Sequence, residues 1–514
     1  MAALQYVPSD ALIVGYDFST GGVKALAFNL KGDVVARVKL PTDLWTAGGV
    51  SELNLMQLEG QARAATRLIA SELDTISATS QWAACGISAT HHSAGLIDTF
   101  GNQIRRAICW NDQTLAKYHA AGLKRLGGQE RAKELTGGPW AVRYSLSHLV
   151  KDEATLDAED WERTQHMLPH GPLAAGYLTG RFEVTSVSSA ASTGIMDLRT
   201  NQWCKGMLAA IENPKYRELA WDNLPEILDM NTPIGPLSEH VVQLFGGVRP
   251  LVFPTLDDQA AGLLGGGAVD AGHVAVILGN SAVVNSSSSI LPQSGTLDAM
   301  KLNWGPYLWM RCYSNGAQFL DRVVGEKPNW AELEEAGRKV DPLCGGVSLM
   351  PFALSEPSIG ITEPWFEWVG DEPADPGVRV RASFEALAYL IALGVREHEA
   401  AGQTITRVTV SGGIARSALM CDILASVLGR ELDLLESDEG TALGAAVVAL
   451  AGLEQSGRAA AGTAERYTVA DAVAAMVRFR PERAKPNAAW VGAYRTGLAA
   501  FEARLNGRKA NGPA

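Results

Sequence analysis

A chain of 514 residues is too long for one hydrophobic core and predicts two large domains or a comparable division. Its hydrophobic content of 47% and charged content of 19% are values of a globular protein. The formal net charge of −12 argues against a general nucleic-acid-binding or anionic-membrane surface, and no run of 18 apolar residues predicts a membrane span.

The cysteines and the N-terminus indicate a reducing compartment. The six cysteines are scattered and form no C-x-x-C pair, which favours free thiols over disulfides or a zinc site. The first residues, MAALQY, have neither the basic start nor the long apolar stretch of a signal peptide. We therefore expect a soluble, cytoplasmic protein without nucleic-acid or membrane partners.

The chain opens with a pattern of three strands, a helix and a further strand. The strands are predicted at residues 11–16, 23–29 and 33–39, the helix at 56–73 and the last strand at 82–88. This βββαβ order predicts a mixed sheet. Residues 115–250 are less regular, with short helical stretches and Gly/Pro turns, and suit an insertion in the first domain.

The turn between the first two strands has the composition of a phosphate site. Asp17 ends the first strand, where a carboxylate can hold a hydrated Mg²⁺. Small residues follow and leave backbone N–H groups free to face a polyphosphate, and a basic residue stands close by: Ser19, Thr20, Gly21 and Lys24. The alternative is an ordinary hairpin.

A partial echo of this hairpin occurs at residues 276–284, where the turn is Gly279, Asn280 and Ser281. A second domain is predicted from about residue 250. Its strands are expected at 274–278, 407–410 and 432–435, and its helices at 384–398, 417–428 and 441–450. This order broadly repeats the first half. The predicted units are therefore 1–250, 251–460 and a helical extension with a tail at 461–514, of which 506–514 look disordered.

The chain resembles the FGGY carbohydrate kinase family of the actin-like ATPase superfamily, nearest its xylulose kinase-like branch. Five segments in family order carry this resemblance: GYDFSTGGVK at 15–24, GISATHHS at 86–93 with ICWND at 108–112, DQAAG at 258–262, SGGIARS at 411–417, and TALGAA at 441–446. The resemblance implies an α/β fold of two RNase H-like (actin-like ATPase) domains, with mixed sheets flanked by helices around a central cleft. It also implies transfer of the γ-phosphoryl group of ATP to a sugar hydroxyl.

The resemblance assigns Asp258 as the catalytic base that accepts the proton of the sugar hydroxyl. Asp257 is offset by one residue from the family motif. From the residues alone, either aspartate can instead be the cap of the following helix.

The resemblance also assigns the ligand contacts. ATP and its phosphates are expected at Asp17, Ser19, Thr20, Gly21, Lys24, Gly279, Asn280, Ser281, Gly412 and Gly413, with Mg²⁺ at Asp17 and Asp258, through water. Sugar is expected at His91, His92, Trp110, Asn111, Asp258 and Gln259, with Asp112 as a further hydrogen-bonding group. The helix segment at 442–445 is expected to support the Gly412–Gly413 loop from beneath without contacting ligand.

Two of the sugar contacts have alternatives. The adjacent histidines, His91 and His92, suggest a metal, but neighbouring residues at a strand end point in opposite directions, so a sugar contact is favoured. Trp110 can be a flat wall for the sugar or an ordinary core residue.

Several positions depart from the family pattern, so the sugar and the strength of activity stay open. Family glycine and threonine are replaced by Ser19 and Asn280, and two polar motifs appear as His170–Gly171–Pro172 and Ser355–Glu356–Pro357. The glycerol kinase string Asn-Gln-Arg-Glu-Thr is absent at 89–93, which favours a ketopentose such as xylulose or ribulose. The alternatives are a non-catalytic sugar- or nucleotide-binding regulator and a filament-type ATPase. A homodimer is possible.

Overall fold

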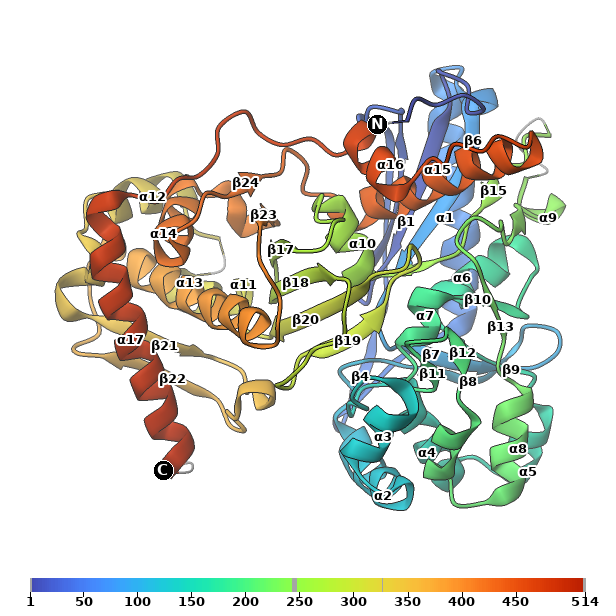
Figure 1. Ribbon diagram of the computed structural model, residues 1–514, viewed down its shortest axis with the longest axis horizontal. Coiled ribbons are helices and arrows are strands. Elements are labelled where there is room, and N and C mark those ends of the chain that lie inside the picture. Colours follow the sequence, from blue (N-terminus) through green and yellow to red (C-terminus); the bar gives the residue numbers. More distant parts are fainter. Residues whose placement is uncertain (1, 243–246, 326, 512–514) are drawn as a thin grey trace.

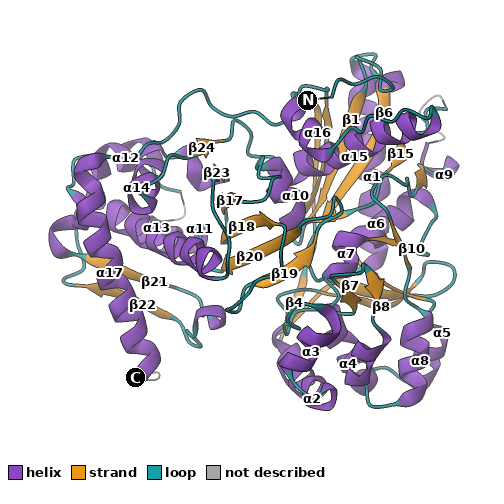
Figure 2. Ribbon diagram, in the orientation of Figure 1, coloured by secondary structure: helices purple, strands orange, loops and turns teal. Residues whose placement is uncertain are grey.

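The computed structural model describes residues 2–242, 247–325 and 327–511 and has two lobes (Figure 1). The lobe at the right of Figure 1 is built mainly from the first half of the chain, and the lobe at the left from the second half. Each has a mixed sheet with helices packed against it (Figure 2). The predicted α/β class with two sheets is confirmed.

The sheet of the first lobe has the strand order β14-β15-β6-β1-β2-β3, with β16 also paired to β6. Strand β1 is antiparallel to β2 and parallel to β6, which gives the mixed sheet that the sequence predicts. The strands are β1 Leu12–Phe18, β2 Gly22–Phe28, β3 Val34–Pro41, β6 Trp82–Ala89, β14 Gly235–Pro236, β15 Leu251–Val252 and β16 Leu256–Asp257. The predicted helix is α1, Leu55–Thr75, with Asn54 as its N-cap.

A second, smaller sheet of the first lobe has the order β4-β5-β8-β7-β9. Its first two strands lie between β3 and α1 and were not predicted from the sequence. The strands are β4 Trp45–Ala47, β5 Val50–Leu53, β7 Ala94–Ile97, β8 Gln103–Ile108 and β9 His166–Pro169. Short strand pairs complete the lobe: β10 Val184–Ser186 with β13 Glu226–Leu228, and β11 Met196–Asp197 with β12 Gln202–Trp203.

The irregular middle of the chain forms short helices, most of which lie around this smaller sheet, whereas the last packs on α1 (Figure 1). They are α2 Ala116–Leu126, α3 Gln129–Thr136, α4 Ser145–Thr155, α5 Ala158–Arg163, α6 His170–Thr179, α7 Val187–Ala191, α8 Pro214–Asp222 and α9 Glu239–Val242. This arrangement fits the predicted insertion in the first lobe.

The second lobe repeats the topology of the first. Its sheet has the order β19-β20-β18-β17-β23-β24, in which β17 is antiparallel to β18 and parallel to β23, as β1 is to β2 and β6. The strands are β17 His273–Leu278, β18 Ala282–Ser288, β19 Asp298–Lys301, β20 Tyr307–Tyr313, β23 Arg407–Ser411 and β24 Asp433–Leu434; β21 Ser348–Phe352 pairs separately with β22 Trp365–Val369. The helices are α11 Ala317–Val324, α12 Trp330–Arg338, α13 Pro376–Ala400 and α14 Ala418–Leu428.

Helix α15, Gly440–Ala460, packs across β1 and β6 in the first lobe. The approach is close: a Cβ at Gly15 would lie 1.9 Å from the carbonyl oxygen of Ala442, and one at Gly86 would lie 1.9 Å from that of Ala445. Glycine is therefore required at both positions of the strands, where the helix backbone lies against them. The first half of α15 is buried, as expected of a core helix, and the sheet of the first lobe covers it.

The first sheet extends beyond residue 250, where the sequence places the domain boundary. Both β15 and β16 follow that position and pair with β6. Helix α10, Asp258–Gly265, follows β16 and packs on α15. The chain therefore crosses between the lobes after the strand that carries Asp257.

The tail is more ordered than expected. Helix α16, Val469–Met476, packs on α15, and α17, Ala488–Asn511, packs on α14 with Tyr494, Leu498, Phe501 and Leu505 buried. The disorder predicted for 506–514 is wrong for 506–511 because this buried face holds the helix in place. Residues 512–514 lie outside the described residues. Among the residues described, no helix is long and apolar enough to cross a membrane.

Candidate functional site

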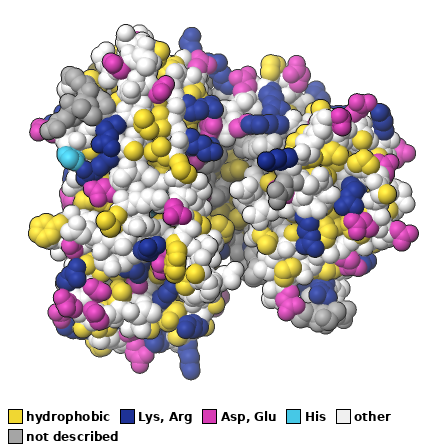
Figure 3. Space-filling view, turned by 180° about the vertical axis from the view of Figure 1, so that it is seen from behind, with side chains coloured by type: hydrophobic (Ala, Val, Ile, Leu, Met, Phe, Trp, Pro, Cys, Tyr) yellow, Lys and Arg dark blue, Asp and Glu magenta, His cyan; other side chains and the backbone are white. Residues whose placement is uncertain are grey.

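The ends of three parallel strands bring the predicted acidic residues to one edge of the first sheet. Asp17, near the end of β1, lies opposite Ser88 of β6 and Lys24 of β2. Asp257, at the end of β16, lies opposite Ala89 of β6. Because carboxyl ends of parallel strands meet at one edge, Asp17 and the Asp257–Asp258 pair face the same space. The surface is hollowed between the two lobes (Figure 3).

The structure distinguishes the two adjacent aspartates. Asp257 is the N-cap of α10, and its Oδ1 accepts hydrogen bonds from the backbone N–H groups of Gln259 and Ala260, at 3.0 and 2.9 Å. Its Oδ2 accepts a hydrogen bond from the Ser188 hydroxyl. Asp258 occupies the first helical position and does not cap the helix. Its carboxylate is therefore the one left for chemistry.

Asp258 has the electrostatic surroundings of a proton acceptor. Burial raises the pKa of Asp258 to about 8, and the negative charges of Asp257 and Asp17 add to this effect. The His91 backbone N–H donates a 3.2 Å hydrogen bond to its Oδ1, and the Gln259 side chain provides a second hydrogen bond, both of which lower the pKa. A carboxylate whose pKa lies near the working pH suits general-base catalysis.

Asp17 and Asp258 are compatible with a bound Mg²⁺. Burial raises the pKa of Asp17, against the opposing effects of the Thr441 hydroxyl and the charge of Lys24. The charge of Asp17 in turn raises the pKa of Asp258. Carboxylates that disfavour each other's charge, with oxygen atoms as the only ligands, suit a small hard cation that keeps several waters.

The turn after β1 is closed by Ser19. Both its backbone N–H and its hydroxyl donate to the carbonyl oxygen of Gly22, each at 2.9 Å. The two donors of Ser19 are thus engaged within the turn, so in this conformation neither is free for the phosphate that the sequence assigned to it. Gly21 is exposed, and a Cβ there would meet nothing within 4 Å. Thr20 is half-buried beside it.

The ammonium group of Lys24, beside this turn, is paired with a carboxylate. Its Nζ forms a 2.6 Å ion pair with Oε2 of Glu439, the residue directly before α15. Arg37 approaches Oε1 of the same carboxylate at 3.7 Å. Neither Glu439 nor Thr441 was predicted to belong to the site from the sequence. Thr441 is the first residue of the motif TALGAA, where no role was predicted for it.

The corresponding edge of the second sheet carries the other two glycine turns. In the turn between β17 and β18, the Gly279 N–H donates to the Ser281 carbonyl, and the N–H groups of Gly316 and Ala317 donate to the carbonyls of Asn280 and Gly279. Asn280 is exposed at the tip.

Gly412 lies directly after β23 with φ +97°, and a Cβ there would lie 2.3 Å from the carbonyl oxygen of Leu278. Gly413, next to it, is exposed and its Cβ position is open. Gly412 therefore permits the close packing of the loop on β17. Gly413 leaves the outer face of the loop free of side-chain atoms.

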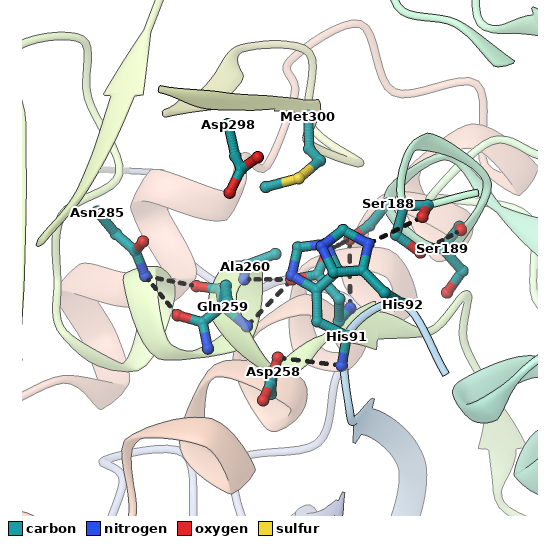
Figure 4. Close-up of polar contacts among 12 residues, drawn as sticks. His91, His92, Ser188, Ser189, Asp258, Gln259, Ala260, Asn285, Asp298 and Met300 are labelled. Carbon is teal, nitrogen blue, oxygen red and sulfur yellow. Dashed lines mark hydrogen bonds and ion pairs between the residues drawn. The ribbon is translucent and has the colours of Figure 1, made fainter. Parts of the chain in front are cut away.

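The two histidines lie side by side, which corrects the expectation that their side chains point in opposite directions. The rings of His91 and His92 stack at 3.6 Å between centroids (Figure 4). The physical reason is that β6 ends at Ala89 and His92 has φ +60°, so strand alternation no longer holds. Both side chains are buried.

His92 has a defined tautomer. Its Nδ1 lies 2.9 Å from the Ser192 carbonyl oxygen, which can only accept, so Nδ1 carries the proton. Burial and the neighbouring charges of Arg143 and His91 lower the pKa of His92, which keeps the ring neutral. Its Nε2 is buried, has no partner among the described residues, and can accept a hydrogen bond from a hydroxyl group. The Tyr144 ring stacks on its other face at 4.4 Å.

The loop after β8 contains two exposed residues followed by a buried aspartate. Trp110 is 41% exposed, so it is not a core residue, and Asn111 is exposed beside it. Asp112 is buried and accepts hydrogen bonds from the N–H groups of Thr114 and Ser51. Asp112 therefore stabilises the loop, and the expectation that it contacts sugar is not supported by these contacts.

Gln259 connects the site to the second lobe, in which Glu356 is also buried. The Asn285 side-chain amide donates to Oε1 of Gln259 at 3.0 Å (Figure 4). Glu356 belongs to one of the motifs that depart from the family pattern. It is buried and accepts hydrogen bonds from the backbone N–H and the side chain of Asn315, and burial raises the pKa of Glu356 to about 7. Arg143, which pairs with Asp298 of β19, was also missed from the sequence.

The two sheets repeat one topology, with acidic strand ends in the first and glycine turns in both, and they define a two-domain α/β protein. Residues 12–265 match the N-terminal domain of the FGGY family of carbohydrate kinases, and residues 370–453 match its C-terminal domain. The chain belongs to the FGGY family of carbohydrate kinases, and it is a sugar kinase.

Individual relatives agree on the family but differ in substrate. The chain is 26% identical to a xylulose kinase of Escherichia coli over 462 residues, covering 85% of this chain and 89% of the relative. It is 25% identical to a glycerol kinase of Clavibacter michiganensis over 478 residues, covering 86% and 89%. A crystal structure of a xylulose kinase from Rhodospirillum rubrum has a similar fold, with a TM-score of 0.81 at 22% identity, covering 97% of this chain and 99% of that chain.

Proposed function

We propose that this kinase transfers the γ-phosphoryl group of ATP to a hydroxyl of a ketopentose such as xylulose or ribulose, with Asp258 as general base. The observation that supports this most directly is the division between the two aspartates. Asp257 caps α10, whereas Asp258 is left with a pKa raised to about 8 at the edge where the strands of the first sheet end.

The proposed step is an in-line transfer. The sugar oxygen forms a bond to the γ-phosphorus as the bond between that phosphorus and the β–γ bridging oxygen breaks, and ADP leaves. The hydroxyl proton passes to Asp258 as this occurs. Magnesium, held by Asp17 and Asp258 through water, would neutralise phosphate charge.

The nucleotide is proposed to lie between the two glycine edges. Its phosphates face Thr20, Gly21 and Lys24 of the first lobe. From the second lobe they face Gly279, Asn280 and Ser281. The open face of Gly413 is proposed to lie against the adenosine, with Gly412 packing the loop on β17.

The sugar is proposed to lie beside the histidines. The free Nε2 of the neutral His92 accepts a hydrogen bond from one hydroxyl, and Gln259 reads another close to the base. Trp110, exposed on its loop with Asn111, provides an apolar wall. A ketopentose is favoured over glycerol because it has more hydroxyl groups to satisfy these polar groups. Similarity to xylulose kinases supports the same choice.

The test is a coupled assay of ADP formation with xylulose, ribulose, other pentuloses, hexuloses, polyols and glycerol. We expect the highest kcat/KM with a ketopentose. Asp258→Asn, which keeps the shape of the side chain, is expected to lower kcat by at least about 100-fold while sugar binding, measured by calorimetry, persists. Wild-type turnover in Asp258→Asn would reject the base, and a clear preference for glycerol would reject the substrate class.

A further inference from the structure

We propose that His91, Asp257 and Asp258 form a binding site for a divalent transition-metal ion of the zinc, cobalt or manganese type, which shares Asp258 with the proposed magnesium position but has His91 and Asp257 in place of Asp17. Each residue offers one ligand atom, and these atoms lie within 4.8 Å of one another. Figure 4 shows the His91 ring directed toward α10 above Asp258.

The side chain of His91 indicates that this cluster binds a ligand. Its side chain is buried, and its Nδ1 lies 3.5 Å from Oδ1 of Asp257, beyond a good hydrogen bond. Among the described residues, neither ring nitrogen has a hydrogen-bond partner. A buried imidazole without partners is costly, and a ligand at this point would satisfy it.

The carboxylates have the capacity and the support to be ligands. Asp257 accepts from two backbone N–H groups and from the Ser188 hydroxyl, and a carboxylate has about four acceptor positions, so one position remains. Those three donors fix its orientation, as outer hydrogen bonds do in metal sites. Asp258 accepts one backbone hydrogen bond, from His91, and is half-buried, which leaves water a route to complete the coordination.

The donor set selects the class of ion. One imidazole nitrogen with two carboxylate oxygens suits zinc, cobalt or manganese better than magnesium, which prefers oxygen ligands alone. The charge of Arg143 acts on His91, and the carboxylate of Asp298 on β19, with which Arg143 pairs, offsets that charge. An ion here would hold the oxygen of Asp258 that the proposed function needs, so it would inhibit the kinase. That consequence alone rests on the proposed function.

The test measures binding directly, with neither nucleotide nor sugar. Metal-free protein in excess Mg²⁺ is titrated with Co²⁺ and followed by visible absorption. We expect one tight site with nitrogen and oxygen ligands and no sulfur-to-cobalt charge-transfer band, which separates it from the free thiols. His91→Met, with a side chain of similar length, is expected to weaken binding at least about tenfold.

Two further variants make the result decisive. Asp257→Asn retains an N-cap residue but loses the charge, and it is expected to weaken Co²⁺ binding with little loss of stability. His273→Asn, at the start of β17 in the second sheet, is the matched control and leaves binding unchanged. The proposal is overturned if wild-type protein binds no Co²⁺ in excess Mg²⁺, or if His91→Met and Asp257→Asn bind it as tightly as wild type.

Discussion

Asn285 of β18 holds the side chain of Gln259 on α10, with 3.0 Å between its Nδ2 and the Oε1 of Gln259. Because the oxygen of the Gln259 amide accepts this bond, its NH₂ group remains to donate elsewhere. The hydrogen bond from the Gln259 side chain lowers the pKa of Asp258, which requires that NH₂ group to face the carboxylate. Asn285 is therefore a positioning residue that acts on the proposed base through Gln259.

Asn285→Asp is expected to reverse this chain of hydrogen bonds. A carboxylate can only accept, so the amide of Gln259 turns its NH₂ toward position 285 and its oxygen toward Asp258. The pKa of Asp258 then rises, and the acid limb of kcat/KM moves to higher pH. The measurement is the pH–rate profile of the variant. Asn285→Leu, which removes the bond without reversing it, is the control, and coincident profiles for all three proteins would contradict the positioning role.

The pH dependence of the wild-type enzyme follows from the raised pKa of Asp258. A base must be deprotonated to accept a proton, and a group with a pKa of about 8 is mostly protonated at lower pH. Activity is therefore expected to rise with pH through this region. Asp257→Asn removes a negative charge that contributes to the raised pKa, so its acid limb is expected at lower pH than that of wild type. A shift of the acid limb of the pH–rate profile to higher pH in Asp257→Asn would refute this electrostatic account.

The contact between β1 and α15 predicts a sharp difference between two glycines of one hairpin. Gly15→Ala would place a Cβ 1.9 Å from the Ala442 carbonyl oxygen, which forces the helix and strand apart, whereas Gly21→Ala meets nothing within 4 Å. We expect Gly15→Ala to lower the free energy of unfolding by about 1–3 kcal/mol or more. Gly21→Ala is expected to change it by less than about 0.5 kcal/mol. Denaturant unfolding measures both, and equal stabilities would be the contrary result.

The elements with strong local patterns were predictable from sequence. Strands β1 and β2 and helix α1 differ from their predicted bounds by one or two residues, because alternation and helical spacing are local signals. The short strands β4 and β5 were missed, since three or four residues carry little pattern.

The arrangement within the site was less predictable because it depends on tertiary contacts and on one backbone angle. Lys24 and its partner Glu439 are 415 positions apart. The left-handed backbone of His92 reverses the expected direction of its ring, and a histidine after a strand gives no sign of this. By contrast, the family resemblance already distinguished Asp258 from its neighbour Asp257. The structure shows the physical difference between them, because Asp257 is the N-cap of α10 and Asp258 is the first residue of the helix.

Lys24 is expected to affect nucleotide binding more than stability. Its ion pair with Glu439 is partly exposed, at 34% and 17% of the two side chains, and such pairs contribute less than about 1 kcal/mol. Lys24→Met should therefore leave the melting temperature nearly unchanged but raise the KM for ATP, with little change in the KM for sugar. Glu439→Gln, which frees the ammonium group, is the paired variant. If Lys24→Met lowers stability strongly and leaves the KM for ATP unchanged, the lysine serves the fold alone.

Trp110 provides the corresponding test on the sugar side. Because the side chain is 41% exposed, Trp110→Ala removes little buried surface, and the loop is held separately by Asp112. We expect a raised KM for the ketopentose, an unchanged KM for ATP and a melting temperature close to that of wild type. Phe100→Ala, at an 83% exposed position on the turn between β7 and β8, is the matched control for loss of an exposed aromatic ring. Equal sugar KM values in Trp110→Ala, Phe100→Ala and wild type would remove Trp110 from the proposed sugar site.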